Sequence, residues 1–444
     1  MIFSKSEKPT KKRYNILALI FGTVVINYLD RTNISVAASA MSESLEISTV
    51  QMGLVFSAFG WTYVALQIPG GIIVDKIRLR LLYALMLFLW SIATLLQGFV
   101  NSFAVLLGLR ASIGVFEAPS YPANNAIVTK WFPEEERASA IAIYTSGQFI
   151  GLAFLFPVLT AVQDWVGWRG LLIASGIVGI IWAVVWYVFY RDPDRHGSIN
   201  ATELSHIEKG GGLVKAAQKS KSLEKFNWAD LAEAFKHRKL WGVYIGQFCI
   251  GSVAIFFLTW FPTYLVEYRG FDFIKSGFLA SVPFLAAFLG VLLSGFTSDF
   301  LIKKGYSIEF SRKTPVLIGF FLSFSIVGAN YTDSTFFIIL FLTIAFFGNG
   351  LASITWVFVS LIAPKNLVGL IGGVFNLMGG LSAVIVPVVI GALVDEDDFS
   401  PALFFIGGIT IVGFLSFLLV VGKIKRIELD TTKRAVNGLW ESEK

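Results

Sequence analysis

The sequence predicts an all-α integral membrane protein with twelve transmembrane helices in two pseudo-symmetric six-helix bundles. Of its 444 residues, 55% are hydrophobic and 15% are charged, and the mean hydropathy of +0.70 lies far above that of soluble proteins. Apolar segments of about 20 residues, the length that crosses a bilayer, recur along the chain. The basic residues lie almost entirely on one side of these segments, so the net charge of +6 reflects membrane topology, and no nucleic-acid partner is expected.

The predicted spans form two groups of six around one long polar stretch. The first group lies at about 15–37, 49–74, 81–100, 103–128, 137–162 and 167–190. The second group lies at about 240–266, 275–301, 313–331, 335–361, 367–394 and 400–422. The expected domains are an N-terminal tail (1–14), a first bundle (15–190), a central loop (191–239), a second bundle (240–422) and a C-terminal tail (423–444).

The placement of Lys and Arg predicts which side each loop faces, because these residues concentrate in short cytoplasmic loops. Of the 36 Lys and Arg residues, Arg31 and Arg110 fall within spans, and Arg169, Arg269 and Lys275 fall in loops on one side. All the others lie on the side that holds both termini and the central loop. We therefore expect both termini and the central loop in the cytoplasm, with the charges of the central loop forming a solvated surface.

A short repeat relates the two groups of spans. Gly71 is followed by Asp75 after the second span, and Gly295 is followed by Asp299 after the eighth, with basic residues after each pair. The glycine allows close helix approach, and the carboxylate can cap a neighbouring helix or pair with a basic residue. The repeat predicts two pseudo-equivalent bundles.

Four ionisable residues lie well inside the apolar runs: Asp30 and Arg31 in span one, and Arg110 and Glu117 in span four. A charge there costs about 2.5–3.5 kcal/mol on insertion scales, so partners or a function must hold it. Arg110 and Glu117 share one helical face, and the neighbours in span one point about 100° apart, which permits a four-charge cluster. The alternative is that salt bridges merely hold the bundle together, but buried ion pairs stabilise weakly. A function explains the charges better.

The chemistry of the cluster fits proton-coupled binding of an organic anion. A carboxylate in a partly dehydrated cavity can gain or lose a proton as the cavity opens or as a substrate anion binds nearby. All three histidines lie in the central loop, so coupling must rest on Asp30 and Glu117. The guanidinium of Arg31 or Arg110 should hold the acid group of the substrate, because its planar fork binds a carboxylate through two hydrogen bonds.

Uncharged polar side chains in the spans are candidates for binding the rest of a polyhydroxyl substrate. Such side chains are costly in lipid, so most should face the bundle interior. For any single one, contact between helices explains its presence as well as contact with substrate does. The candidates are Tyr63, Gln67, Asn124, Asn125, Gln148, Gln247, Asn349, Ser353, Thr355 and Asn376, accompanied by Trp260 and Trp356.

The sequence does not support an enzyme. Its single cysteine, Cys249, excludes an internal disulfide and a cysteine metal site, and no Cys/His cluster or serine constellation is present. We therefore expect no metal and no cofactor, with protons as the coupling ion. Twelve spans without an extramembrane domain predict a monomer in the lipid bilayer.

The loop repeat, the twelve spans and the long central loop resemble the major facilitator superfamily. One departure is Arg78, which stands where that superfamily usually has a second glycine. The runs at 144–149, 346–350 and 372–376 are similar to a bacterial sugar-acid branch, most closely the D-galactonate:proton symporters. Three further runs resemble the anion:cation symporter family: Tyr-Leu-Asp-Arg-Thr-Asn at 28–33, the segment from Arg110 through Glu117-Ala118-Pro119, and Trp-Phe-Pro-Glu-Glu-Glu-Arg-Ala at 131–138.

The resemblance implies a proton-coupled symporter of the bacterial inner membrane that imports a small sugar acid by alternating access. The implied substrate is a hexonate or hexuronate, with D-galactonate foremost. Two alternatives stay open: an organic-anion antiporter or exporter, and a transport-like substrate sensor.

The resemblance also assigns roles to individual residues. It gives proton coupling to Asp30 and Glu117, anion binding to Arg31, and modulation of Glu117 to Arg110. Tyr63, Gln148 and Asn376 match the sugar-acid branch closely, which favours them as substrate contacts. The expected substrate-binding set is Arg31, Tyr63, Gln148, Gln247, Ser353, Trp356 and Asn376.

Overall fold

The computed structural model describes residues 8–214, 232, 235–364, 367–395 and 398–427. Every regular element in this part of the chain is a helix, which confirms the predicted all-α class for it. Much of the predicted tails and the middle of the predicted central loop lie outside the described residues.

The first bundle uses helix breaks at two places to fit its spans. The fourth span is divided between α4 and α5, which meet at Ala118 and Pro119. α6 consists of two helices that meet at Gly167, whose φ of 71° favours glycine, and each of the two supplies one span. The helices are α1 (Lys12–Leu45), α2 (Thr49–Lys76), α3 (Leu79–Gln97), α4 (Phe103–Glu117), α5 (Ser120–Trp131) and α6 (Glu134–Phe189).

The second bundle follows a connecting segment that contains the short turn η1 (Pro193–Arg195) and the helix α7 (Ala201–Lys209). Several of its spans end in a tighter or wider helical turn. Its elements are α9 (Arg238–Thr259), α10 (Phe261–Thr263), η2 (Tyr264–Tyr268), α11 (Phe273–Lys303), α12 (Ile308–Ser323), η3 (Phe324–Tyr331), α13 (Thr335–Ala352), η4 (Ser353–Thr355), α14 (Trp356–Ile362), α15 (Val368–Leu393), α16 (Ser400–Leu415) and η5 (Ser416–Val420).

Ten helical segments among the described residues are long and apolar enough to cross a membrane. α1 is not one of the ten, because polar residues that include Asp30 and Arg31 lower its hydropathy. α6 is counted once although it turns at Gly167. Adding α1 to the ten and dividing α6 in two gives the twelve spans that the sequence predicts.

The two bundles meet closely at one face of the protein. We call this the opposite face, because it lies away from the termini face, where α1 begins and η5 ends. At the opposite face α2 packs on α15, so that a Cβ on Gly53 would lie 2.5 Å from the Pro387 carbonyl oxygen and one on Gly60 would lie 2.9 Å from that of Ala383. Small residues therefore bring the backbones of the two halves into contact.

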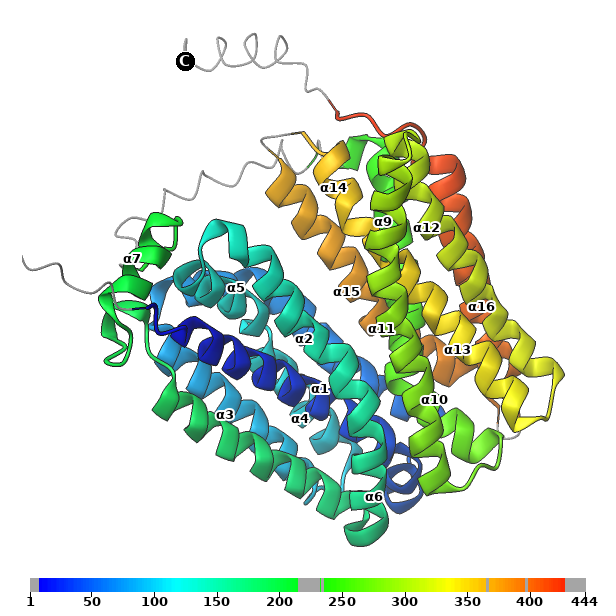
Figure 1. Cartoon of the computed structure of the whole chain (residues 1–444). Helices are drawn as coiled ribbons and strands as arrows, with labels where there is room; N and C mark the ends of the chain where they lie inside the picture. The colour runs from blue at the N-terminus through cyan, green and yellow to red at the C-terminus, as the bar shows by residue number, and fades with distance from the viewer. Residues whose placement is uncertain (1–7, 215–231, 233–234, 365–366, 396–397, 428–444) are drawn as a thin grey trace, which may run out of the picture.

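The bundles separate toward the termini face, as Figure 1 shows. The contact between α2 and α15 continues as far as a hydrogen bond of 3.0 Å from Asn376 Nδ2 to Gln67 Oε1. Beyond it, a Cβ on Gly71 or Gly373 would have no heavy atom of another residue within 4 Å, and Ile72 is exposed. The structure is therefore closed at the opposite face and open at the termini face.

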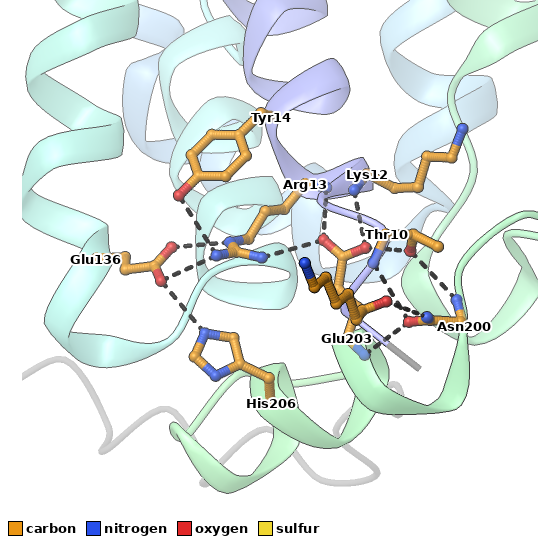
Figure 2. Close-up of polar contacts among 9 residues, drawn as sticks. Thr10, Lys12, Arg13, Tyr14, Glu136, Asn200, Glu203 and His206 are labelled. Atoms are coloured by element: carbon orange, nitrogen blue, oxygen red, sulfur yellow. Dashed lines mark hydrogen bonds and ion pairs between the residues drawn. The ribbon is translucent and has the colours of Figure 1, made fainter. Parts of the chain in front are cut away.

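The connecting segment corrects one expectation, because its charges are not all solvated. Glu203 on α7 is fully buried and accepts hydrogen bonds from the Thr10 hydroxyl and from the backbone N–H groups of Lys12 and Arg13, as Figure 2 shows. Burial raises the pKa of Glu203, but these hydrogen bonds outweigh it and hold the pKa below the ordinary value. The carboxylate caps the first turn of α1, which explains why a charge is buried in a segment expected to face water.

Candidate functional site

The structure brings the four intramembrane charges together where α1, α2 and α4 meet. Gly114 of α4 makes this possible, because a Cβ there would meet the Phe59 carbonyl oxygen and the Thr62 hydroxyl of α2. The Thr62 hydroxyl also donates a hydrogen bond of 2.6 Å to the carbonyl of Ala111. The close approach of α2 and α4 places aromatic residues of α2 against the charged side chains.

Arg31 and Glu117 form the central ion pair of the site. Arg31 Nε and Nη2 donate hydrogen bonds of 3.1 and 2.9 Å to the same atom, Glu117 Oε2. Glu117 is fully buried, and its Oε1 has no hydrogen-bond partner among the described residues. The pair thus leaves the second carboxylate oxygen and Arg31 Nη1 available for other partners.

Asp30 and Arg110 lie beside this pair but do not form a salt bridge with each other in the described structure. Arg110 Nη1 donates a 3.2 Å hydrogen bond to the backbone carbonyl of Asp30 rather than to its carboxylate. Both carboxylate oxygens of Asp30 are buried with no hydrogen-bond partner in the part of the chain that is described. Thr94 and Trp90 of α3 lie beside the carboxyl, and neither makes a hydrogen bond of normal geometry to it.

Three aromatic rings surround the Arg31 guanidinium. Its central carbon lies 5.1 Å from the ring centre of Tyr28, 4.7 Å from that of Phe59 and 4.8 Å from that of Tyr63. Such contacts favour a cation by about 0.5–2 kcal/mol each, more where water is excluded. Arg31 is therefore held as a cation in a fixed direction, with 12% of its side chain exposed.

The six predicted uncharged substrate residues lie in three places. Tyr63 contacts Arg31 directly, and Gln148 joins the same site because its Oε1 accepts a 2.8 Å hydrogen bond from the Tyr28 hydroxyl. Asn376 of α15 reaches the first bundle through its hydrogen bond to Gln67. Asn376 therefore stands between the halves, while Tyr63 and Gln148 adjoin the charges.

The other three predicted contacts lie within the second bundle. Gln247 Oε1 accepts a 3.1 Å hydrogen bond from Thr355, next to the half-buried Ser353 in η4. Trp356 is 51% exposed, and its ring packs edge-on against the ring of Phe375, with the two ring centres 4.7 Å apart. None of the contacts described for these residues joins them to the charged cluster, so their role as substrate contacts stays a prediction.

Some polar candidates bond to other helices instead. Asn124 accepts a hydrogen bond from Tyr83, and Asn125 accepts one from Tyr144, each at 2.9 Å. The Trp260 indole is buried and donates to the Pro387 carbonyl at the closed face. These three residues hold helices together in this conformation, which was the alternative explanation for any single candidate.

The sequence reasoning missed three residues of α1 and α2 that line the site. Tyr28 links Arg31 to Gln148, and Phe59 lies under both Arg31 and Arg110. Asn27 is buried, and its Nδ2 has no hydrogen-bond partner within the described chain. Helical spacing could have found the two residues of α1, because Asn27 and Tyr28 lie four and three positions before Arg31.

Within the described residues, no group of three or more His, Cys, Asp or Glu side chains could hold a metal ion. The site is built instead from two arginines, two carboxyls and aromatic rings. Such an arrangement can bind an organic anion and can exchange protons at its carboxyls.

Comparison with known proteins gives one family and a consistent group of relatives. A family model described as the Major Facilitator Superfamily matches residues 20–387. The chain is 49% identical to a D-galactonate transporter of Escherichia coli, covering 95% of this chain and 98% of that one. It is 40% identical to the probable galactarate/D-glucarate transporter GudP of Bacillus subtilis, covering 95% of this chain and 94% of that one.

Solved structures with the same arrangement of helices are more distant in sequence. A bacterial homolog of the human lysosomal transporter Spinster, in an inward-facing and occupied conformation, matches with a TM-score of 0.67 and 19% identity, covering 93% of this chain and 95% of that one. The nucleoside transporter NupG matches with a TM-score of 0.69 and 14% identity, covering 92% and 100% of the two chains. These likenesses establish the fold.

Proposed function

The chain belongs to the Major Facilitator Superfamily, and we propose that it is a proton-coupled symporter that imports the sugar acid D-galactonate by alternating access. We place it in the inner membrane of a bacterium with both termini in the cytoplasm, where the excess of Lys and Arg at the termini face belongs. In that orientation the structure is open to the cytoplasm.

The substrate assignment is supported by the relatives and by the chemistry of the site. The relatives carry names of transporters for D-galactonate and for galactarate or D-glucarate, all of which are polyhydroxyl chains with a carboxylate. Arg31 offers one partly accessible guanidinium, while Arg110 is 3% exposed and bonds to the backbone. One accessible arginine suits D-galactonate, which has one carboxylate, better than a diacid.

The observation that carries the proposal is that Glu117 forms an ion pair with Arg31, the residue proposed to bind the substrate carboxylate. Arg31 donates two hydrogen bonds to Glu117 Oε2, so an ionised Glu117 competes with the substrate carboxylate for the same donors. A proton on Glu117 removes its charge and frees Arg31 for the substrate. Loss of that proton restores the Arg31–Glu117 pair and expels the substrate carboxylate.

Asp30 supplies the second proton site in this proposal. An ionised carboxylate that is buried with no hydrogen bond or ion pair costs several kcal/mol. Both oxygens of Asp30 are in that position within the described structure. Asp30 therefore carries a proton in the conformation seen here and releases it when the surrounding helices move.

The experiment is uptake of labelled D-galactonate into proteoliposomes by the Glu117→Gln variant. Glutamine cannot ionise, so the variant should exchange substrate across the membrane without a gradient but should accumulate much less than the wild-type protein when the outside is acidic, because only Asp30 remains to couple protons. The control is Glu43→Gln, because Glu43 is exposed at the opposite face. Accumulation by Glu117→Gln that rises with the imposed pH gradient as steeply as in the wild-type protein would overturn the proposal.

The same vesicles separate symport from the alternatives. With symport, adding D-galactonate outside makes the external medium more alkaline, because protons enter with the substrate. An antiporter would make it more acidic. A sensor would bind D-galactonate and transport none.

A further inference from the structure

The termini face of the second bundle carries a basic pocket that the proposed transport function does not use. The pocket has a volume of about 400 Å³ and lies between the start of α9 and the residues that follow η5. That volume falls in the usual range for small-molecule sites, about 300–1,000 Å³. The residues that line it are His237, Arg238, Lys239, Lys425, Arg426 and Ile427.

The described protein does not neutralise the charge of this pocket. Arg238 Nη2 donates to the carbonyl of Leu419 at 2.8 Å, and the two Nη atoms of Arg426 each donate at 2.6 Å to the carbonyls of Ala363 and Ser360. Carbonyl groups satisfy hydrogen bonds but leave the positive charge in place. Among the residues that the structure describes, no acidic side chain lines the pocket.

Two lysines of the pocket are better placed to bind an anion than the two arginines, which are held by carbonyl groups. Lys425 is exposed and Lys239 is half-buried. Neither lysine forms an ion pair or a hydrogen bond with another described residue. Each ammonium carries three donors and a full charge. The pocket therefore combines fixed guanidinium groups with two lysines that can move onto a ligand.

The matching position of the first bundle shows how the protein neutralises such a helix start when no ligand is needed. Arg13 at the beginning of α1 bonds to Glu136 at 2.8 Å and to Glu203 at 3.2 Å, as Figure 2 shows. Those hydrogen bonds and charges outweigh the effect of burial and lower the pKa of Glu136, so that it stays ionised. The start of α9 has no equivalent carboxylate among the residues that line the pocket.

The surface next to the pocket indicates which anion fits. Trp241, one turn into α9, is 39% exposed, and Leu418 and Leu419 of η5 are 47% and 58% exposed. In a membrane protein such side chains face lipid, and a tryptophan at a helix end marks the level of the headgroups. The pocket therefore lies at the membrane surface, directly beside a face that acyl chains would cover.

We propose that this pocket binds the phosphate of an acidic phospholipid headgroup, with Lys239 and Lys425 as ligands and the acyl chains against Trp241, Leu418 and Leu419. The site is separate from the charged cluster between α1 and α4. It belongs to the leaflet at the termini face, whichever side of the cell that leaflet faces.

The test is native mass spectrometry of the full-length protein in detergent with added phosphatidylglycerol or phosphatidylcholine of identical acyl chains. The wild-type protein should retain phosphatidylglycerol in preference to phosphatidylcholine. The double variant Lys239→Gln/Lys425→Gln should bind phosphatidylglycerol at least about tenfold more weakly than the wild-type protein. The reason is that each lysine near a membrane contributes a favourable contact to an anionic lipid. The matched control is Lys303→Gln/Lys304→Gln, which removes two exposed charges at the end of α11 on the same face.

The proposal is overturned if the pocket variant and the control lose the acidic lipid equally or retain it equally. It is also overturned if inorganic phosphate stabilises the wild-type protein against heat while no preference for phosphatidylglycerol is seen, because the occupant would then be a soluble anion. The single variant Lys425→Gln, whose side chain is exposed beyond the last helix, provides the same comparison if the double variant does not fold.

Discussion

At the scale of single residues, the site depends on a competition for one guanidinium. Arg31 lies among three aromatic rings, which fix its direction, and it bonds through two nitrogens to Glu117 Oε2. A substrate carboxylate must therefore displace the Glu117 carboxylate from Arg31. The protonation state of Glu117 decides which of the two carboxylates binds.

Arg31→Lys should weaken D-galactonate binding at least about tenfold although the charge is kept. Lysine presents a compact ammonium that cannot reproduce the planar two-nitrogen contact, and it stacks less well on aromatic rings. Isothermal titration at fixed pH measures the loss, with Arg195→Lys as the control because the Arg195 side chain is 60% exposed. Unchanged affinity in Arg31→Lys would mean that Arg31 does not hold the carboxylate.

The sequence identified all four charged residues but could not pair them. Periodicity places Arg110 and Glu117 on one face of α4, and both Arg31–Glu117 and Asp30–Arg110 were conceivable pairs. The structure forms the first pair, whereas Arg110 turns to the Asp30 backbone. The choice depends on where the tertiary fold places α1 relative to α4, and no local sequence pattern encodes that placement.

At the scale of elements, α4 can position its charges only because it packs closely against α2. Gly114→Ala should destabilise the protein by about 1–3 kcal/mol, because the new methyl group meets the Phe59 carbonyl oxygen and the Thr62 hydroxyl. Gly108→Ala in the same helix is the matched control, since a Cβ there has no atom within 4 Å. Thermal unfolding in detergent compares them, and equal melting temperatures for the two variants would contradict the packing described here.

The helix α7 should lose its hold on α1 in acid. The folded-state pKa of Glu203 lies below the ordinary value of 4.5, so its contribution is complete above that pH and is lost as the pH falls through the folded pKa. Hydrogen exchange, corrected for intrinsic rates, should show protection of α7 and of the first turn of α1 falling below pH 4.5.

The variant Glu203→Gln should show weak protection of these segments at neutral pH and little further change in acid. Glu208→Gln on the same helix is the control, because Glu208 is exposed. Protection in Glu203→Gln that matches the wild-type protein at every pH would rule out the capping role of Glu203.

Most spanning helices follow from apolar length alone, and their predicted bounds agree with the structure to within a few residues at most ends. The expectation that the charges of the central loop form a solvated surface was wrong for Glu203 on α7. The charges of this segment resemble those of any polar loop, and the burial of Glu203 depends on the start of α1, which lies 190 residues away in sequence. A contact between residues so far apart produces no periodic pattern in the sequence.

At the scale of the whole molecule, transport requires the opposite face to open and to close again in each cycle. Gly53 lets α2 touch the backbone of α15 at Pro387, so Gly53→Leu should prevent closure at that face. The variant should bind D-galactonate from the opposite face but transport almost none. Gly71→Leu, at a position with no neighbour within 4 Å in the present state, is the comparison. Normal transport by Gly53→Leu would show that the α2–α15 contact does not have to form.

The two-bundle architecture was predictable because span count, charge placement and the loop repeat all point to it. The conformation was not, since states that differ by a few kcal/mol share one sequence. The contacts described for Asn376, Gln247 and Trp356 belong to this one conformation. Their part in binding therefore depends on how the halves close around a substrate.

Calorimetry in two buffers of different ionisation enthalpy measures whether D-galactonate binding loads a proton onto Glu117. If it does, the heat of D-galactonate binding to the wild-type protein near neutral pH differs between the buffers by an amount that corresponds to proton uptake. The Glu117→Gln variant should bind D-galactonate with the same heat in both buffers. Equal heats in the wild-type protein, or undiminished proton uptake in Glu117→Gln, would show that Glu117 does not take up the proton.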